Sequence, residues 1–216
     1  MRHERMRLYL RTFLVLAATL VGPVTAQVVR IPPRGIVPPE VLESARQATQ
    51  ALADEVVRGD LAAPIRKMYP EWKTKEAAKV GGVKKLEARA LKAVQELRAK
   101  GVKINVMRAE QPFSAFEVDF GLRGQQKKPI YRKWLVFVPT TSIITAMNSA
   151  KNPPEVVDMR MESYQIAISD KGRNNWSFLD GNQIEAFQLR QLFPFLPKNN
   201  RDLALPKVGG KIIKNR

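Results

Sequence analysis

The stretch of residues 156–181 constrains the fold most, because it has the pattern of a long antiparallel hairpin. Two runs in which apolar and polar residues alternate flank a polar turn at residues 170–175. In the first run the alternation changes phase, since Met161 and Tyr164 fall on opposite parities. A strand with a strict period of two cannot change phase without an extra residue. We therefore predict a β-bulge near residues 162–163 and a bent strand.

Residues 1–26 have the features of a secretory signal peptide. Four Arg within residues 2–11 come before an uncharged apolar run at residues 12–22. Val24 and Ala26 are small enough for the −3 and −1 positions of a signal peptidase cleavage site. The apolar run is about half of the roughly 20 residues that a membrane-spanning helix needs. We expect cleavage after Ala26, export to the periplasm or the extracellular space, and no stable membrane span after cleavage.

Charge and residue types narrow the function. The whole chain has a net charge of +17, and removing the four Arg and one Glu of residues 1–26 leaves +14. A charge of this sign favours anionic partners. The only His is His3 and there is no Cys, so residues 27–216 contain neither. These absences exclude Ser-His-Asp and Cys-His catalysis and metal sites built from imidazole or thiolate. We expect no metal and no cofactor, and the missing His and Cys weigh against an enzyme without excluding one that uses carboxylates.

The remaining sequence predicts one α+β domain at residues 40–206. It follows a proline-rich lead-in at residues 27–39 and precedes a basic, flexible tail at residues 207–216. The expected architecture has three N-terminal helices packed on a strongly curved antiparallel sheet of four to six strands. A short C-terminal helix completes it.

Apolar spacing places the three helices. They are predicted over residues 40–58, around Ile65, and over residues 83–100, whereas residues 72–82 show no regular pattern. The buried face of the last helix should consist of Leu86, Ala90, Ala93 or Val94, and Leu97. Its other faces carry Lys84, Lys85, Arg89, Lys92, Arg98 and Lys100.

Strands follow the helices. Alternation predicts them near residues 102–106, 115–120, 131–138 and 142–147, ahead of the hairpin. The third run is nearly all apolar, so we expect a central strand that is covered on both faces. After the hairpin, Asn182 and Glu185 have capping-box spacing before a helix at residues 183–192.

The order of these elements and several short motifs resemble the nuclear transport factor 2-like (SnoaL-like) cone-fold superfamily, in an uncharacterised secreted bacterial branch. The motifs are Met68-Tyr69-Pro70, Gly81-Gly82, Val138-Pro139, Trp176-Ser177-Phe178-Leu179-Asp180-Gly181 and Leu192-Phe193-Pro194. The resemblance implies a cystatin-like curved sheet wrapped on the helices, with a conical pocket open at one end.

The resemblance also implies site residues. The pocket would be lined by the aromatic side chains of Trp134, Tyr131, Tyr164 and Trp176. Enzymes of the superfamily often use a His or an Asp at the pocket floor, and the His is absent here. Acid–base chemistry would fall to Asp119, Glu162 and Tyr164, and then to Glu117, Asp158 and Tyr131. Each carboxylate has a structural alternative, as an outward-facing side chain or as the partner of a Lys or Arg.

Three functions remain open. The leading hypothesis is a non-catalytic exported domain that binds a small apolar ligand in the pocket or an envelope protein on the sheet. The second is a basic envelope protein that docks on an anionic polymer through Lys127, Lys128, Arg132 and Lys133 and through the basic third helix. The third is a carboxylate-based isomerase or dehydratase. A homodimer through the outer face of the sheet is compatible with each.

Overall fold

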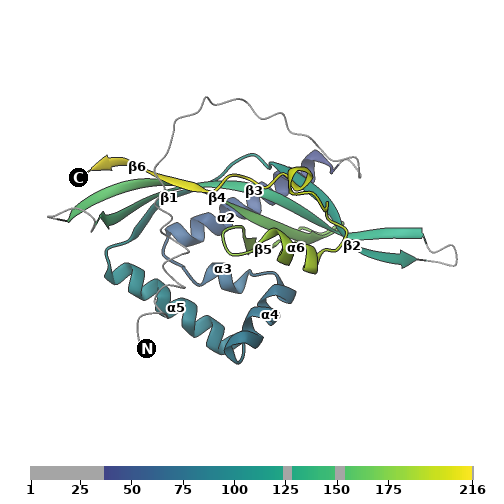
Figure 1. The fold of residues 1–216 in the computed structure, drawn as a ribbon, viewed down its shortest axis with the longest axis horizontal. Helices are drawn as coiled ribbons and strands as arrows, with labels where there is room; N and C mark the ends of the chain where they lie inside the picture. Colours follow the sequence, from purple (N-terminus) through teal and green to yellow (C-terminus); the bar gives the residue numbers. More distant parts are fainter. Residues whose placement is uncertain (1–36, 124–127, 149–153, 216) are drawn as a thin grey trace.

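The computed structural model describes residues 37–123, 128–148 and 154–215. They form an α+β fold in which helices flank an antiparallel sheet of six strands (Figure 1), as the sequence predicts. The helices are α2 (Pro39–Val57), α3 (Ala63–Arg66), α4 (Pro70–Val80), α5 (Val83–Ala99), α6 (Ala186–Leu192) and α7 (Asn200–Leu203). The strands are β1 (Lys103–Ala109), β2 (Ser114–Arg123), β3 (Lys128–Asn148), β4 (Glu155–Asp170), β5 (Ser177–Asp180) and β6 (Gly209–Asn215).

The sheet is built on one long antiparallel pair, β3 and β4. Their register is continuous from Lys133 opposite Asp170 to Asn148 opposite Glu155. Two shorter strands, β2 and β1, follow one another along the outer edge of β3. Two others, β5 and β6, do the same along the outer edge of β4, and the sheet remains open. The predicted hairpin of residues 156–181 is confirmed as β4 and β5.

β3 continues through Pro139, where the sequence predicts a break between two strands. The Pro139 carbonyl accepts a hydrogen bond of 2.8 Å from the N–H of Glu110, on the side of β1 and β2. Since the nitrogen and the carbonyl of one strand residue point to the same side, the Pro139 nitrogen faces this connection and not β4. A proline at this position therefore removes no hydrogen bond of the β3–β4 ladder.

The bulge expected near residues 162–163 is wrong. β4 pairs with β3 without interruption, and its register shift lies on the other edge, opposite β6, between Asp158 and Met159. The apolar pattern changes phase because β4 buries opposite faces at its two ends. Val157 is buried on one face, and Tyr164 is buried on the other.

Each face of the sheet has its own apolar core. On one face α2 packs through Ala45 and Leu52, against the strand and loop residues Ala109, Val136, Val138, Ala167 and Phe178. On the opposite face α4, α6 and α7 contribute Trp72, Leu189 and Leu203, which pack with Phe116, Leu135, Phe137, Tyr164, Ile166 and Ile168. The expected covering of β3 on both faces is confirmed for Leu135 to Val138, all of which are fully buried. Tyr131 and Trp134 at the near end are only partly covered.

The helical region contains α4, where no regular pattern was found. Pro70 occupies its first turn, and Gly81 ends it in the left-handed conformation at φ 84°. Only Trp72 and Ala77 of this helix are buried, so its apolar stripe is too short to be recognised in the sequence. The prediction of three N-terminal helices is therefore wrong by this one helix.

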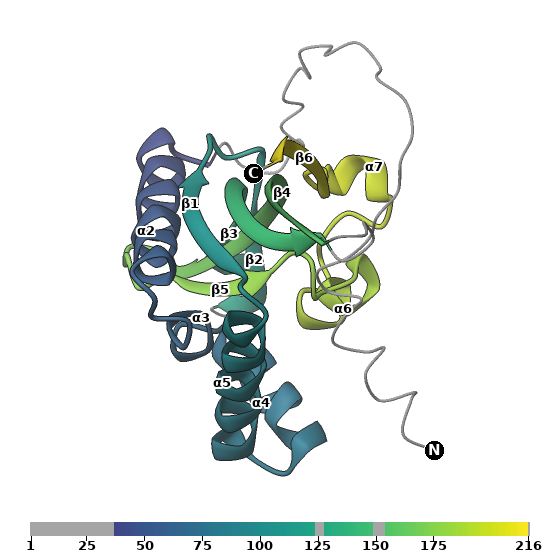
Figure 2. The same ribbon diagram turned by 90° about the vertical axis from the view of Figure 1, so that its left-hand side faces the viewer.

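The buried face predicted for α5 is also wrong. No residue of α5 is buried, and Leu86, Ala90 and Leu97 are only half-covered. The helix packs on α4, and the two form an arm that extends away from the sheet (Figure 2). Amphipathic spacing showed which side of the helix is apolar, but it contains no information on how much of that side a partner covers.

The C-terminal region differs from expectation in two places. The capping box predicted for Asn182 and Glu185 is wrong. α6 begins after a capping box formed by Glu185 and Gln188, and the side chain of Asn182 donates instead to the hydroxyl of Ser163 at 2.6 Å. The tail expected to be flexible from residue 207 pairs with β4 as β6, since it offers a free backbone to an otherwise open sheet edge.

The N-terminal predictions lie mostly outside the described residues. The signal peptide at residues 1–26 and residues 27–36 of the lead-in are not described, whereas Val37 is buried. Among the helices that the structure describes, none combines the length and the apolar character needed to cross a membrane.

Close packing at Gly181 gives a test of this fold. A methyl group at this position would overlap the ring of Tyr164, which is buried in the core beside Phe137. Overpacking of this kind costs about 1–3 kcal/mol. We expect Gly181→Ala to lower the free energy of unfolding by this amount in chemical denaturation. Gly209→Ala is the matched control, since a Cβ there meets nothing within 4 Å. Equal stability of the two variants would contradict the packing described.

Candidate functional site

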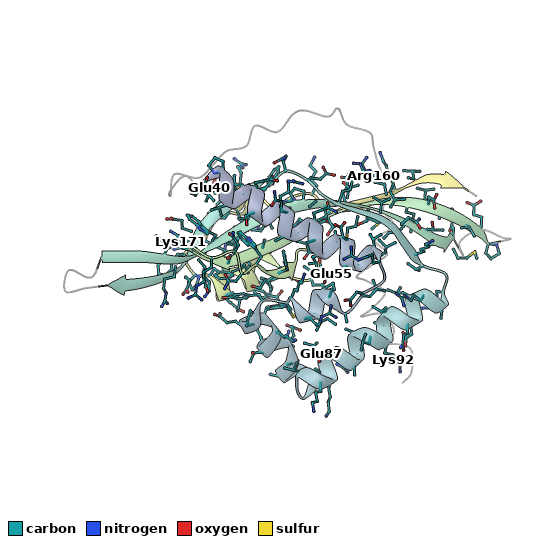
Figure 3. The ribbon with its side chains drawn as sticks, turned by 180° about the vertical axis from the view of Figure 1, so that it is seen from behind. Glu40, Glu55, Glu87, Lys92, Arg160 and Lys171 are labelled. Atoms are coloured by element: carbon teal, nitrogen blue, oxygen red, sulfur yellow. The ribbon has the colours of Figure 1, made fainter. Side chains whose placement is uncertain are left out.

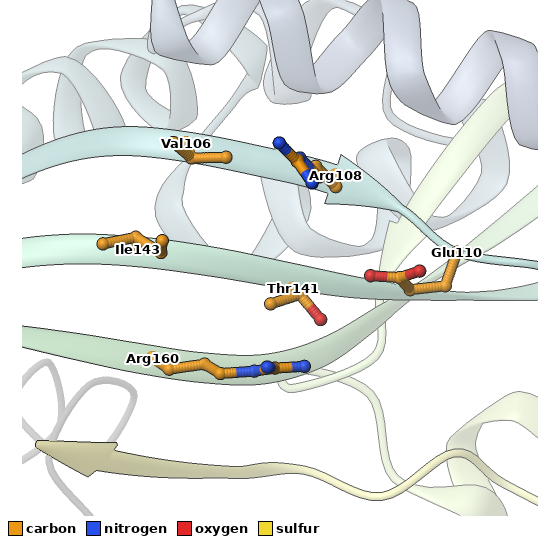
Figure 4. A pocket seen from close by; sticks show the side chains of 6 residues that line it. All are labelled: Val106, Arg108, Glu110, Thr141, Ile143 and Arg160. Carbon is orange, nitrogen blue, oxygen red and sulfur yellow. The ribbon is translucent and has the colours of Figure 1, made fainter. Parts of the chain in front are cut away.

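A shallow hollow lies on the sheet where β1, β3 and β4 run side by side (Figure 4). It has a volume of about 220 Å³. Two cross-strand rows form it, since Ile143 pairs with Val106 and Arg160, and Thr141 pairs with Arg108. The lining side chains are Val106, Arg108, Glu110, Thr141, Ile143 and Arg160.

The hollow exists because the sheet extends beyond its helices. Strand alternation places Thr141 and Ile143 on the same face of β3 as Leu135 and Phe137. The latter two are covered by the core that includes α6 and α7, whereas the former two are only partly buried. α2 covers the opposite face of β1, where the Gln50 side chain bonds to the backbone of β1.

The polar groups of the hollow suit binding better than catalysis. Arg160 lies 3.6 Å from Glu162 in an exposed pair, a contact that contributes little. Arg108 has no ion pair with any residue that the structure describes. The guanidinium groups of Arg108 and Arg160 lie on either side of Thr141 (Figure 4). Val106 and Ile143 form an apolar patch beside them, and Glu110 adds a carboxylate to the hollow.

Asp119, the first catalytic candidate, occupies a strained position in β2. Its φ is 62°, in the left-handed region that residues other than Gly rarely adopt. Its carboxylate lies 3.2 Å from the Arg132 guanidinium and 3.3 Å from the Lys133 ammonium, and Lys133 also lies 3.4 Å from Asp170. These ion pairs match the structural alternative foreseen for Asp119, as the partner of a Lys or Arg.

A second hollow, of about 200 Å³, adjoins Asp119. Its other lining residues are Leu192, the last residue of α6, and Phe193, Pro194 and Phe195, which begin the connection to α7. The floor is apolar, and the one charged side chain at its edge is committed to Arg132 and Lys133. The hollow therefore offers no free acid or base.

The other carboxylate candidates also have partners. Glu117 accepts from the ammonium of Lys171, which lies 4.3 Å from the centre of the Trp134 ring. Asp158 is buried and accepts from the hydroxyl of Thr145 at 2.6 Å. Glu162 is exposed and faces only Arg160. Each of these carboxylates thus has an identifiable structural partner.

Tyr164 belongs to the core. Its ring packs 6.0 Å from that of Phe137, and only 4% of the residue is exposed. Burial, and secondarily the charge of Asp180, raise the pKa of its phenol to about 12. Such a phenol stays protonated at neutral pH, and it is out of reach of a molecule in solution.

The structure does not bring the four predicted pocket aromatics together. Trp176 packs on the α2 side, where its indole N–H donates to Ser44 at 2.9 Å, and strand alternation places Trp134 on this side as well. Tyr164 is on the opposite side of the sheet, as is Tyr131 by the same alternation.

The predicted anion-binding set is likewise not a cluster of free charges. Lys127 lies outside the described residues, and only the backbone of Lys128 is described, at the start of β3. Arg132 and Lys133 are both paired with Asp119. Within the described part of the chain, no group of three or more His, Cys, Asp or Glu is placed to hold a metal ion.

Comparison with known proteins gives no match. No family model fits the chain, and no curated protein and no solved structure matches it. The site must therefore be interpreted from its own residues.

Sequence reasoning missed the hollow on β1, β3 and β4. Arg108 and Arg160 were not singled out, because each is one charged residue in an otherwise ordinary strand. The apolar alternation that begins at residue 102 gives no signal for the hollow. The register shift between Ile104 and Val106 places these two residues opposite Ile144 and Ile143, and therefore on opposite faces of the sheet.

The turn between β4 and β5 provides a test of the local electrostatics. The Asn175 side chain accepts from the Ser169 hydroxyl at 2.8 Å and donates to the Asp170 carboxylate at 3.0 Å. The second bond, and then Lys133, hold the pKa of Asp170 below its usual value. We expect Asn175→Ala to lose about 1–2 kcal/mol of stability and to raise the pKa of Asp170 in an NMR titration.

The sign of the accompanying pH effect follows from linkage. A carboxyl group with a depressed pKa stabilises the folded state above the unfolded pKa of about 3.9, and this stabilisation is lost as the pH falls below it. Asn175→Ala should therefore lose less stability than the wild type on acidification. An unchanged pKa of Asp170 in the variant would contradict the assignment.

Proposed function

We propose that the chain is an exported, non-catalytic binding domain of the nuclear transport factor 2-like (SnoaL-like) superfamily, which binds a partner protein in the hollow on its sheet. The observation that carries this proposal is the uncovered face of β1, β3 and β4. There the apolar side chains of Val106 and Ile143 lie beside the guanidinium groups of Arg108 and Arg160. Export follows from the signal-peptide pattern of residues 1–26.

The arrangement of the elements supports the superfamily. Helices α2 to α5 precede an open antiparallel sheet whose long central pair is flanked by shorter strands. We propose, as part of the same assignment, that the sheet has the curvature and the conical shape that the resemblance implies.

The composition of the hollow supports a protein partner. Apolar side chains next to arginines, as in this hollow, are typical of protein interfaces. Sites for small molecules usually enclose about 300–1,000 Å³, and the hollow is smaller and open to solvent. It suits one or two side chains of a larger partner, and a second copy of this chain would count as such a partner.

Two observations weigh against the other hypotheses. An enzyme would need a free acid or base, but Asp119, Glu117 and Asp158 all have hydrogen-bond or ion-pair partners. A small apolar ligand inside the domain would need space beside Tyr164, which is instead filled by packed side chains.

Ile143→Asp tests the proposal. A charge placed in the centre of an interface should weaken binding by about 30-fold or more. The partner would be recovered with the wild-type protein from the envelope fraction of the source cells, and its affinity for each variant would then be measured. Analytical ultracentrifugation of the purified chain would detect self-association.

Ile212→Asp is the matched control. It makes the same change on β6, where Ile212 is 46% exposed and lies outside the hollow. The account expects this variant to bind like the wild type. A partner that binds Ile143→Asp and the wild type equally well would contradict the proposed surface.

A further inference from the structure

α5 carries a concentration of basic side chains without acidic partners. Lys84, Lys85, Arg89 and Lys92 are exposed, and none pairs with a carboxylate in the ranges that the structure describes. Lys100, directly after the helix, is exposed in the same way. In other parts of the described chain many cations are paired, as Lys67 is with Glu55.

The acidic residues of α5 do not balance these charges. Glu87 is bonded to Lys73 of α4 at 2.9 Å, and the other acidic residue is Glu96. The adjoining carboxylate on α4, Glu76, is paired with Lys79. The outward face of α5 is therefore strongly positive.

This face also exposes one large apolar side chain. Leu91 is 45% exposed and lies about 20° around the helix from Lys84, and the small residues Ala88 and Ala99 are exposed as well. With 100° between successive residues, Ala88 and Ala99 fall on the side of the helix that carries Lys85 and Lys92. Small side chains there allow the helix to approach a flat surface closely.

The position of α5 leaves this face accessible. The helix packs on α4, and the Arg98 guanidinium donates to the Gly59 carbonyl at 2.8 Å, which ties its C-terminal end to the α2–α3 connection. Figure 3 shows Lys92 on the α5 arm, apart from Arg160 on the sheet. The arm is thus separate from the hollow proposed to bind a protein.

We propose that the outward face of α5 docks on an anionic lipid membrane. Cations attract the helix to anionic headgroups, and Leu91 inserts at the boundary of the acyl chains, as in interfacial amphipathic helices. An anionic polymer would use the cations alone and would leave Leu91 exposed to water. The combination of charge with uncovered apolar surface favours the lipid. This inference concerns a different surface from the sheet hollow and does not depend on it.

Vesicle binding tests the proposal. Purified residues 27–216 would be mixed with vesicles of equal parts phosphatidylglycerol and phosphatidylcholine, or of phosphatidylcholine alone, and the bound fraction measured by sedimentation. We expect binding to the anionic vesicles alone, weakening with added salt. The triple change Lys84→Ala, Lys85→Ala and Lys92→Ala should weaken it roughly 100-fold, since each basic residue contributes about fivefold near an anionic surface.

A second variant separates lipid from polymer. Leu91→Ser keeps every charge, and it should weaken vesicle binding about fivefold because part of a leucine side chain no longer leaves water. Its binding to dextran sulfate, a soluble polyanion, should stay unchanged. Because α5 contains no buried residue, these variants should keep the wild-type circular dichroism spectrum and melting temperature.

Two controls match these variants. Lys198→Ala, Arg201→Ala and Lys207→Ala together remove the same charge from exposed positions elsewhere. Phe187→Ser removes an apolar side chain that is 54% exposed on α6. Both controls should bind vesicles like the wild type.

Three results would overturn the proposal. They are no binding of the wild type to anionic vesicles, equal losses in the α5 and control charge variants, and full vesicle binding by Leu91→Ser. The last result would assign the face to anionic polymers.

Discussion

The continuous pairing of β3 with β4 is the interaction on which the rest of the structure depends. It supplies both a backbone ladder and the two faces on which α2 and the C-terminal helices pack. Leu135 to Val138 are fully buried, alternately against α2 and against the core that includes the C-terminal helices. The outer strands each pair with only part of one long strand, so they depend on this ladder for their position.

Two long strands with helices on limited parts of each face leave some surface uncovered. The C-terminal helices protect the face near Phe137 but not near Ile143, and this difference creates the hollow. The α4–α5 arm lies to one side, and its basic face meets no other element among the described residues. Both surfaces that we propose for binding therefore lie outside the two apolar cores.

Much of this fold could be predicted, because apolar period and burial agree in its main elements. The stripe of α2 that includes Leu52 is buried as expected, and the hairpin of β4 and β5 is where alternation placed it. The failures have physical causes. Pro139 normally marks a strand end, but here its nitrogen faces the gap between β1 and β2. α4 buries only two residues, so periodicity could not reveal it.

The candidate site was less predictable. A sequence shows that Asp119 is acidic and that Trp134 is aromatic, but not that Asp119 adopts φ 62° and pairs with Lys133, or which face Trp134 occupies. The cations of α5 were visible, whereas the absence of buried residues in that helix depends on tertiary packing. The hollow on the sheet and the basic face of α5 are exposed because no described element packs on them, and local sequence patterns contain no information on such long-range packing.

Hydrogen–deuterium exchange of the free protein tests this account most directly. The account places the β3–β4 ladder at the centre of the cooperative core and α5 outside it. Amides of Leu135 to Val138 should then exchange only on global unfolding, whereas those of α5 should exchange orders of magnitude faster through local opening. Exchange in α5 as slow as in β3 would contradict the account, because it would make α5 part of the same folding unit.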